Sequence, residues 1–378
     1  MDISTLCVHG CEKKFDTTGA VAVPIFASAT FAHPGVGQST GFDYSRSLNP
    51  TNVHLEDTIA ALEEGSHAVA FSSGMAAVGA LMELFAPGDH IIASDDLYGG
   101  TVRLFSHISQ KNGVQVSYAA ALGDIEKKIT PSTKAVFLET PSNPMMRVKD
   151  ISAVAAITRK YNALLIVDNT FLTPYFQKPF FLGADIVLHS GTKYLGGHND
   201  TLAGLLVVKS DELAEKLRFI AKTTGGCLSP FDSFLIIRGI KTLAIRMERQ
   251  QETALKIVRW LLEHSAVKKV YYPGLQEHPD YNVSRRQTSG FGGMISFSVR
   301  DGQTAVHILE SVKIIKYAES LGGVESLITY PVLQTHADIP ESERKARGID
   351  ECLLRLSVGL EASDDLIADL KQAFGNVI

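Results

Sequence analysis

Four short, largely apolar runs between residues 68 and 190 constrain the fold more than any other feature of this chain. They cover residues 68–71, 135–138, 164–167 and 184–188, and each is followed by polar residues. Continuous apolar runs of this length are typical of parallel strands buried on both faces of a sheet. Helix-like stretches alternate with the runs. We therefore predict an α/β fold with a mostly parallel sheet that helices cover on both faces.

The polar residues after the last two runs have side chains suited to imine chemistry. Ligands bind outside the carboxyl ends of parallel strands, and these residues should lie there. The last run leads to Lys193, flanked by Ser190 and Thr192. A partly desolvated lysine loses its proton more easily and can form a Schiff base with an aldehyde, while the hydroxyls can bind an anionic group. The third run leads to Asp168, whose carboxylate can keep a pyridine nitrogen protonated.

The other strand ends offer a phosphate site and ring contacts. After the first run, Ser72-Ser73-Gly74 opens a small-residue helix, whose free N–H groups and positive dipole end suit a phosphate. Tyr98 lies in a glycine-rich turn and can stack on a flat ring, and Asn143 can donate to a ring hydroxyl. Each of these residues alone is also an ordinary cap or turn residue. Their shared position at strand ends indicates pyridoxal 5'-phosphate (PLP) as the cofactor.

Eight motifs, in order along essentially the whole chain, resemble the Cys/Met-metabolism group of PLP enzymes. This group includes the trans-sulfuration enzymes cystathionine γ-synthase, cystathionine γ-lyase and cystathionine β-lyase. The resemblance implies fold type I of the PLP-dependent transferases. The matching motifs are Tyr44-Ser45-Arg46 with Asn49-Pro50-Thr51, Ser72-Ser73-Gly74-Met75, Asp96-Leu97-Tyr98-Gly99-Gly100, Glu139-Thr140-Pro141-Ser142-Asn143-Pro144, Val167-Asp168-Asn169-Thr170, Ser190-Gly191-Thr192-Lys193-Tyr194-Leu195-Gly196-Gly197-His198, Ala318-Glu319-Ser320-Leu321-Gly322-Gly323 and Leu354-Arg355-Leu356-Ser357-Val358-Gly359.

The resemblance also implies a role for each matching residue. Lys193 is expected to bind the cofactor covalently and, with Tyr98, to move protons, while Asp168 pairs with the pyridine nitrogen and Tyr98 stacks on the ring. The remaining cofactor contacts are expected from Asn143, Gly74, Met75, Ser190 and Thr192, and from Tyr44 and Arg46 of a neighbouring subunit. The amino-acid substrate is expected to contact Asp43, Arg103, Asn143, Glu319, Ser320 and Arg355, the last as a two-pronged clamp on its α-carboxylate.

The reaction is less constrained than the cofactor. Glu319, just before Ser320, favours a γ-acting enzyme that makes cystathionine from an acylated homoserine and cysteine, or cleaves cystathionine on the γ side. Residues 335–340 resemble γ-synthases, and Gly100 stands where methionine γ-lyases have a cysteine. The first alternative is β-elimination of cystathionine to homocysteine, pyruvate and ammonia. Two others are a fold-type-I aminotransferase and a cofactor-binding regulatory domain.

Composition limits the partners and the compartment. The chain has 378 residues and a net charge of −5, which argues against a nucleic-acid surface. Its four cysteines lack paired CxxC spacing, so neither a metal site nor a disulfide framework is expected. No apolar run of about eighteen residues indicates a membrane span. No GxxxxGK[ST] motif indicates a P-loop. We expect a cytoplasmic enzyme.

The chain is expected to divide into three parts. Residues 1–46, rich in Gly, Thr, Ser and Pro, should form an arm that completes the active site of a neighbouring subunit. Residues 47–242 should form the large PLP-binding domain, and residues 243–378 a small α+β domain. The small domain should begin with a helix from Leu243 to Glu263, and its polar segment 273–293 should be a loop. The resemblance implies a homotetramer, a dimer of active dimers.

Overall fold

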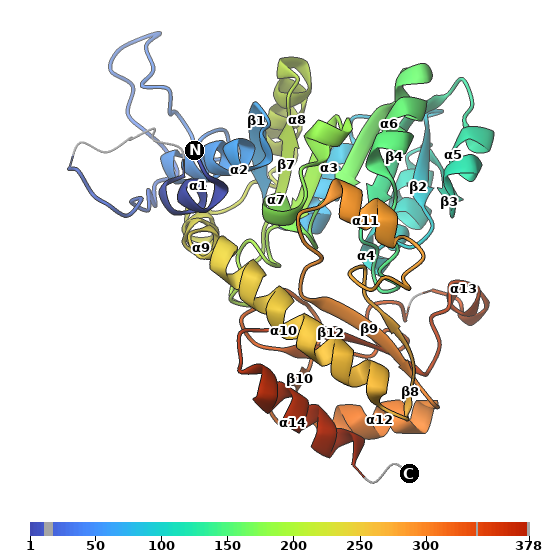
Figure 1. Cartoon of the computed structure of the whole chain (residues 1–378). Helices are drawn as coiled ribbons and strands as arrows, with labels where there is room; N and C mark the ends of the chain where they lie inside the picture. Colours follow the sequence, from blue (N-terminus) through green and yellow to red (C-terminus); the bar gives the residue numbers. More distant parts are fainter. Residues whose placement is uncertain (11–17, 338, 376–378) are drawn as a thin grey trace.

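The structure, a computed structural model, describes residues 1–10, 18–337 and 339–375, so Cys11 and Asp338 lie outside the described residues. Figure 1 shows two parts, each built around one sheet, with the long helix α10 (Leu243–Glu263) reaching from the first part into the second. The first sheet has the strand order β1-β7-β6-β5-β4-β2-β3. Its strands are β1 (His67–Phe71), β2 (His90–Ser94), β3 (Gln115–Ala119), β4 (Thr133–Glu139), β5 (Leu164–Asp168), β6 (Ile186–Ser190) and β7 (Gly204–Val208).

Six of the seven strands run in the same direction, and β7 alone is antiparallel to both of its neighbours. The four apolar runs become β1, β4, β5 and β6, which confirms the predicted mostly parallel α/β sheet. Strand β6 begins two residues later than the run, at Ile186. The reason is Asp185, whose carboxylate accepts a hydrogen bond from the backbone N–H of Leu165 at 2.7 Å and so closes the turn before the strand.

Helices cover both faces of this sheet, and successive strand residues face opposite cores. Val167 packs with one core cluster, while Ile166 packs with the other. The helices of the first face and its edge are α2 (Pro50–Glu63), α5 (Leu122–Lys128), α6 (Ile151–Lys160), α7 (Thr173–Phe176) and α9 (Pro230–Ile240). The second face carries α3 (Gly74–Met82), α4 (Gly99–Arg103) with its π-helical continuation Leu104–Ser109, and α8 (Asp211–Thr224). Asn49, Ser73, Asp150 and Ser210 each accept a backbone N–H with their side chain and fix where a helix begins.

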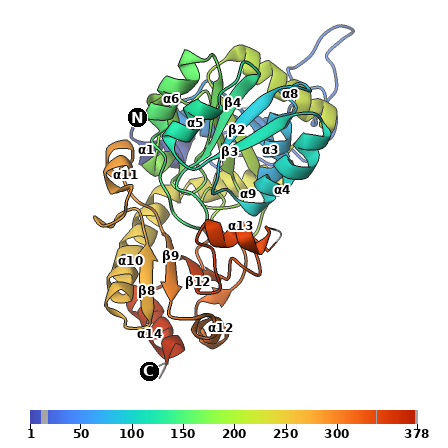
Figure 2. The same ribbon diagram turned by 90° about the vertical axis from the view of Figure 1, so that its right-hand side faces the viewer.

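The second sheet has five strands in the order β10-β11-β12-β9-β8. Only the short pair β10–β11 is parallel. Figure 2 shows α10, α12 and α14 around this sheet, and α13 between it and the larger part. A second apolar core that includes Phe297, Leu356 and Phe374 fills the space beneath the helices. The elements are β8 (Val267–Tyr271), α11 (Tyr281–Gln287), β9 (Met294–Val299), α12 (Gly302–Ser311), β10 (Lys316–Tyr317), β11 (Leu327–Thr329), α13 (Glu341–Ala346), β12 (Leu353–Ser357) and α14 (Ser363–Phe374).

Two segments are more regular than the sequence predicted. The polar segment 273–293 was expected to be a loop but contains α11, because the Gln287 side chain binds the backbone of Lys149 and Ile151 at 3.0 and 3.2 Å. Tertiary hydrogen bonds, rather than an apolar stripe, stabilise this helix. Within the predicted arm, α1 (Ile3–His9) packs on the chain's own α2 and α10, and Cys7 is buried there. No helix of the described residues has the length and apolar character needed to cross a membrane.

Candidate active site

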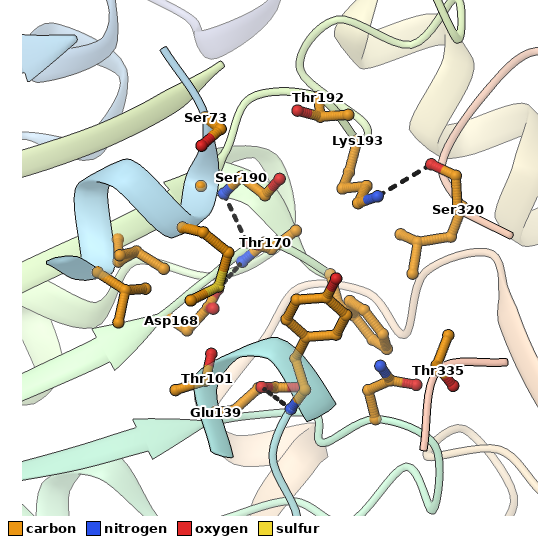
Figure 3. Close-up of a pocket in the computed structure, with 18 of the residues that line it drawn as sticks. Ser73, Thr101, Glu139, Asp168, Thr170, Ser190, Thr192, Lys193, Ser320 and Thr335 are labelled. Atoms are coloured by element: carbon orange, nitrogen blue, oxygen red, sulfur yellow. Dashed lines mark hydrogen bonds between the residues drawn. The ribbon is translucent and has the colours of Figure 1, made fainter. Parts of the chain in front are cut away.

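A cavity of about 340 Å³ lies at the carboxyl edge of the large sheet, where the second part of the chain covers it. Residues at or after the ends of β1, β4, β5 and β6 line one wall, and Glu319, Ser320 and Arg355 line the other. Figure 3 shows Ser320 across the cavity from Asp168. Of the residues predicted to bind cofactor or substrate, eleven line this cavity: Gly74, Met75, Tyr98, Asn143, Asp168, Ser190, Thr192, Lys193, Glu319, Ser320 and Arg355.

Lys193 lies in the turn after β6, and its amine projects into the cavity. Its Nζ donates a hydrogen bond to Ser320 Oγ at 2.9 Å, as Figure 3 shows. Burial and the charge of Arg355, opposed by the carboxylate of Glu319, together lower the pKa of the Lys193 amine to about 8. About a tenth of the amine is therefore uncharged at neutral pH, in the form that attacks an aldehyde.

Asp168 ends β5 and presents its carboxylate to the cavity. The backbone N–H of Thr170 donates to it at 3.0 Å, but burial still raises the pKa of Asp168 above its usual range. Among the described residues that line the cavity, the cations are Lys193 and Arg355. The hydrogen bonds of both cations go to Ser320, Asn143 and Thr329. The Asp168 carboxylate thus has no cation bonded to it among the described residues that line the cavity. A protonated ring nitrogen would supply this positive charge, so Asp168 fits a pyridine cofactor.

A second carboxyl group, Glu139, lies at the end of the neighbouring strand β4. Its Oε2 accepts the backbone N–H of Tyr98 at 2.9 Å and so fixes the turn that carries the aromatic ring. Burial raises the pKa of Glu139 well above its usual range, and the neighbouring Asp168 carboxylate adds to this effect. Two buried carboxyl groups side by side do not both ionise readily, so each group disfavours the charged form of the other.

The amino end of α3 forms a cradle for an anion. The Ser73 side chain caps this helix by accepting the backbone N–H of Ala76 at 3.1 Å, and the N–H groups of Gly74 and Met75 start the helix at the cavity wall. A Cβ atom at Gly74 would lie 3.0 Å from Ser190 Oγ, so glycine keeps the backbone close to that hydroxyl. Backbone N–H groups, a helix dipole and hydroxyls together suit a phosphate.

Arg355 lies on β12 with 1% of its surface exposed. Its Nη1 donates to Asn143 Oδ1 at 2.7 Å, and its Nη2 donates to the Ser320 carbonyl at 2.9 Å and to Thr329 Oγ1 at 3.1 Å. Its Nε has no hydrogen-bond partner in the described chain. Burial lowers the pKa of Arg355 to about 10, which leaves the guanidinium charged at neutral pH. A charged guanidinium that is fixed by three hydrogen bonds and has its Nε donor unused suits the binding of a substrate carboxylate.

Ser320 joins the amine to the guanidinium. It has a φ of 87°, a left-handed backbone conformation that is uncommon for serine. In this conformation the hydroxyl of Ser320 accepts from Lys193 while its carbonyl accepts from Arg355. Backbone strain of this kind is found where the surrounding structure fixes a functional residue, which supports the predicted role of Ser320 in the site.

Four predicted residues do not line the cavity of their own chain: Asp43, Tyr44, Arg46 and Arg103. The first three lie in the N-terminal segment, where the Arg46 guanidinium donates to the Lys222 carbonyl at 2.8 Å. Arg103 is exposed on α4. Thr101 lines the cavity, and a residue two positions further along a helix points to nearly the opposite side. Arg103 therefore does not face the cavity of its own chain, and its substrate contact stays a prediction.

Several lining residues were not singled out from the sequence. Thr170 connects two strands, because its hydroxyl accepts the Ser190 N–H at 2.9 Å while its own N–H binds Asp168. Its position two residues after a functional carboxylate was a usable signal. Thr335 reaches the cavity from the second part of the chain. It begins the segment 335–340 that resembles γ-synthases, but the resemblance assigned no contact to it. Its carbonyl would lie 2.2 Å from a Cβ at Gly99, so glycine there allows the two segments to meet.

The comparison with known families identifies the group of proteins to which this site belongs. The family model described as "Cys/Met metabolism PLP-dependent enzyme" matches residues 4–375. The chain belongs to this family. It is therefore a PLP-dependent enzyme of fold type I, as the sequence predicted. The cavity contains an amine, a carboxylate, an aromatic ring and the amino end of a helix, which are the kinds of group that PLP chemistry uses.

Similar proteins carry three different activity names. The chain is 48% identical to the cystathionine γ-lyase of Bacillus subtilis over 100% of both chains. It is 50% identical to the cystathionine γ-synthase of Haemophilus influenzae, covering 99% of this chain and 98% of the other. It is 49% identical to the cystathionine β-lyase of Lactococcus lactis, covering 98% of each. The crystal structure of a Lactobacillus plantarum cystathionine γ-lyase complexed with L-serine superposes with a TM-score of 0.97 at 45% identity, covering 100% of this chain and 99% of the other.

Proposed function

We propose that this protein is a γ-acting trans-sulfuration enzyme of methionine and cysteine metabolism, which joins cysteine to an acylated homoserine or cleaves cystathionine on the γ side. The observation that carries the proposal is the position of Glu319. Its side chain lines the cavity, directly beside Ser320, and its charge acts on the Lys193 amine. A carboxylate there can bind the distal ammonium of cystathionine, and a glutamate at this position is the residue type that the family resemblance links with γ-acting enzymes.

The chain's residues would hold PLP in one orientation. Gly74, Met75, Ser190 and Thr192 would bind the phosphate, Asp168 the ring nitrogen, Lys193 the aldehyde carbon and Tyr98 the ring face. The chemistry that PLP supplies there is that of an electron sink, which accepts the electrons left on the substrate Cα when a proton is removed. Arg355 would bind the substrate α-carboxylate and orient the Cα–H bond towards the Lys193 amine.

Lys193 is the proposed base. Its amine lies in the cavity, where burial and the charge of Arg355 lower the pKa of the free side chain to about 8, a range that suits reversible proton transfer near neutral pH. Chemistry at Cγ needs a second proton to leave Cβ before the γ-substituent departs, so the base must move between two carbons. The flexible Lys193 side chain can do so, and the Tyr98 hydroxyl is the proposed acid for the leaving group.

We propose that Tyr44 and Arg46 complete the phosphate site of a neighbouring subunit, so that the active unit is a dimer, and that two dimers form a tetramer. The phosphate cradle within one chain offers N–H groups and hydroxyls but no cation of its own among the described residues. A phosphate dianion in a half-buried site needs positive charge. The Tyr44 ring is 47% exposed, and the Arg46 guanidinium lies 5.5 Å from the centre of that ring. Asp43 would reach the distal end of the substrate in the same neighbouring site.

The predicted domain division and compartment remain part of this proposal. The boundary near residue 242 is supported by α10, which starts at Leu243 and leads into the second sheet. A cytoplasmic location is supported by the free thiols of Cys7, Cys227 and Cys352, since disulfides are typical of oxidising compartments.

Product analysis tests the reaction. The purified holoenzyme is incubated with cystathionine, and separately with cysteine plus O-acetyl-, O-succinyl- or O-phosphohomoserine, and the products are identified by mass spectrometry. We expect 2-oxobutyrate from cystathionine, or cystathionine from one acylated homoserine. Pyruvate and homocysteine as the main products would instead establish β-elimination, and the β-lyase relatives make this the second candidate. A Lys193→Ala variant should form none of these products.

A further inference from the structure

A second cavity, of about 960 Å³, opens on the surface between β8 and α13, away from the cofactor site. Figure 1 shows both elements at the right-hand edge of the second part of the chain. Its lining carries five cationic side chains and one carboxylate, although the whole chain has a net charge of −5. The cations are Arg147, Lys268, Lys269, Lys345 and Arg347, and the carboxylate is Glu277.

The charges of this cationic cleft are only partly compensated. Arg147 pairs with Asp95 at 3.4 Å and Lys345 pairs with Glu341 at 2.7 Å. Lys268 and Lys269 are exposed and make no ion pair with the described residues. The Nη2 atom of Arg347 lies 3.4 Å from Glu343, but its buried Nη1 has no hydrogen-bond partner in the described chain. Buried N–H donors are normally satisfied, so this one indicates a missing acceptor. Concave surfaces lined by one sign of charge concentrate ions of the opposite sign.

The floor of the cleft adds apolar and aromatic contact. Met145, Leu262 and Leu275 line it, and the Lys269 ammonium lies 4.8 Å from the centre of the Tyr271 ring. The volume falls in the range of small-molecule sites, about 300–1,000 Å³. The cleft thus combines room, apolar surface and converging positive charge, which suits a small ligand with more than one anionic group.

A short loop connects this cleft to the active site. Ser142 and Arg147 close the loop, because the N–H of Ser142 donates to the Arg147 carbonyl at 2.9 Å and the N–H of Arg147 donates to Ser142 Oγ at 3.0 Å. Within the loop, Asn143 accepts the Nη1 hydrogen bond of Arg355. Arg147 reaches the cleft, where its Nη2 lies 3.5 Å from the carbonyl of Arg347. A ligand that moves Arg147 therefore acts on the residue that holds the carboxylate clamp.

We propose that the cationic cleft is an effector site for a small polyanion bearing phosphate or carboxylate groups, and that its occupation changes substrate affinity through the 142–147 loop. The ligand would bridge Lys268 and Lys269 on β8 and the free donor of Arg347. The site is separate from the cofactor phosphate cradle, and its existence does not depend on which sulfur substrate the enzyme uses.

Calorimetric titration of the PLP-saturated enzyme with pyrophosphate, and separately with citrate, tests the site at low ionic strength. Saturation with PLP keeps the probe out of the cofactor cradle. We expect saturable binding of one probe per chain, weakened at least tenfold in the double variant Lys268→Gln/Lys269→Gln. Tighter binding of pyrophosphate identifies a phosphorylated ligand, and tighter binding of citrate identifies a polycarboxylate. The control is Lys256→Gln, which removes an exposed lysine that pairs with Glu252 on α10, and it should bind as the wild type does.

The effect of the cleft on substrate affinity at the active site is measured in the same preparations. The bound probe should change the KM for the amino-acid substrate at constant ionic strength in the wild type and in the control variant, but not in the double variant. All three proteins should have equal activity without the probe. If binding is not saturable, or if the double variant binds the probe as tightly as the wild type, the proposed polyanion site in the cleft is wrong. Binding without a change in KM would overturn the coupling through the loop.

Discussion

Replacing Arg355 with lysine removes the fork that we assign to the substrate α-carboxylate while keeping the positive charge. In the wild type, the guanidinium donates to Asn143, Ser320 and Thr329 and still has its Nε free. A lysine at this position can hold the substrate with one donor but cannot form two parallel bonds to a carboxylate. One charge-assisted hydrogen bond to the substrate is then lost, together with some of the bonds that orient the clamp.

The size of the effect follows from the contacts. A hydrogen bond to a charged group contributes about 1.5–3 kcal/mol, and a loss of about 2 kcal/mol corresponds to about a thirtyfold change in an equilibrium constant. We expect KM to rise by about that factor and kcat to fall less than KM rises, because Arg355 binds and orients the substrate but moves no proton itself. The buried acceptors left behind, Asn143 Oδ1 and Thr329 Oγ1, should also reduce the free energy of unfolding by about 1–3 kcal/mol.

Steady-state kinetics of product release, measured together with thermal unfolding, separates these two effects. The matched control is Arg218→Lys, which changes a partly buried arginine that binds Glu56 and the Ala68 carbonyl, outside the active-site cavity. It should lose stability but keep the wild-type KM. If Arg355→Lys unfolds earlier yet keeps a KM within about twofold of the wild type, the proposed carboxylate clamp is wrong.

Three further predictions concern Lys193, Asp168 and the site proposed to be shared between subunits. In the apoenzyme the Lys193 amine reacts only when it is uncharged, so the rate of PLP uptake, measured by stopped-flow absorbance, should rise with pH through about 8. Glu319→Gln removes the charge that raises the pKa of Lys193, so the midpoint of this pH dependence should move to lower pH. Asp168→Asn should weaken PLP binding, measured by fluorescence titration, by at least tenfold relative to Asp168→Glu, since it leaves the ring nitrogen without a charged partner. Arg46→Ala and Lys193→Ala subunits should each be inactive alone but regain activity when they are mixed and reassociated, because one site of a mixed dimer then has both an intact Lys193 and an intact Arg46. Mixtures that stay inactive would contradict the shared site.

The elements that the sequence predicted well are those in which burial follows directly from residue type. Strand β5 is a run of Leu, Ile and Val buried on both faces of the sheet, and it coincides with the predicted run except for the added Asp168. The helix predicted from Leu243 to Glu263 is α10, with both ends as expected. In contrast, α11 is polar and depends on bonds from Gln287 to a distant loop, which no local pattern reveals.

The site divides in the same way. Residues at strand ends, such as Asp168 and Lys193, could be predicted because the parallel sheet alone brings those ends together. The position of Thr335 could not, because it depends on how the second part of the chain covers the first. Whether Arg103 faces the cavity depended on the exact phase of a five-residue helix, and a short helix after a glycine pair gives no periodic signal to fix that phase.

The most direct test of PLP attachment is borohydride reduction of the yellow holoenzyme, followed by proteolysis and mass spectrometry of the peptides. Reduction should bleach the visible absorption and leave a pyridoxyl phosphate group on a single residue, Lys193. The Lys193→Ala protein should bind PLP without forming this reduced adduct. A reduced adduct on another lysine of the native enzyme, or none at all, would contradict the assignment of Lys193 and the reaction built on it.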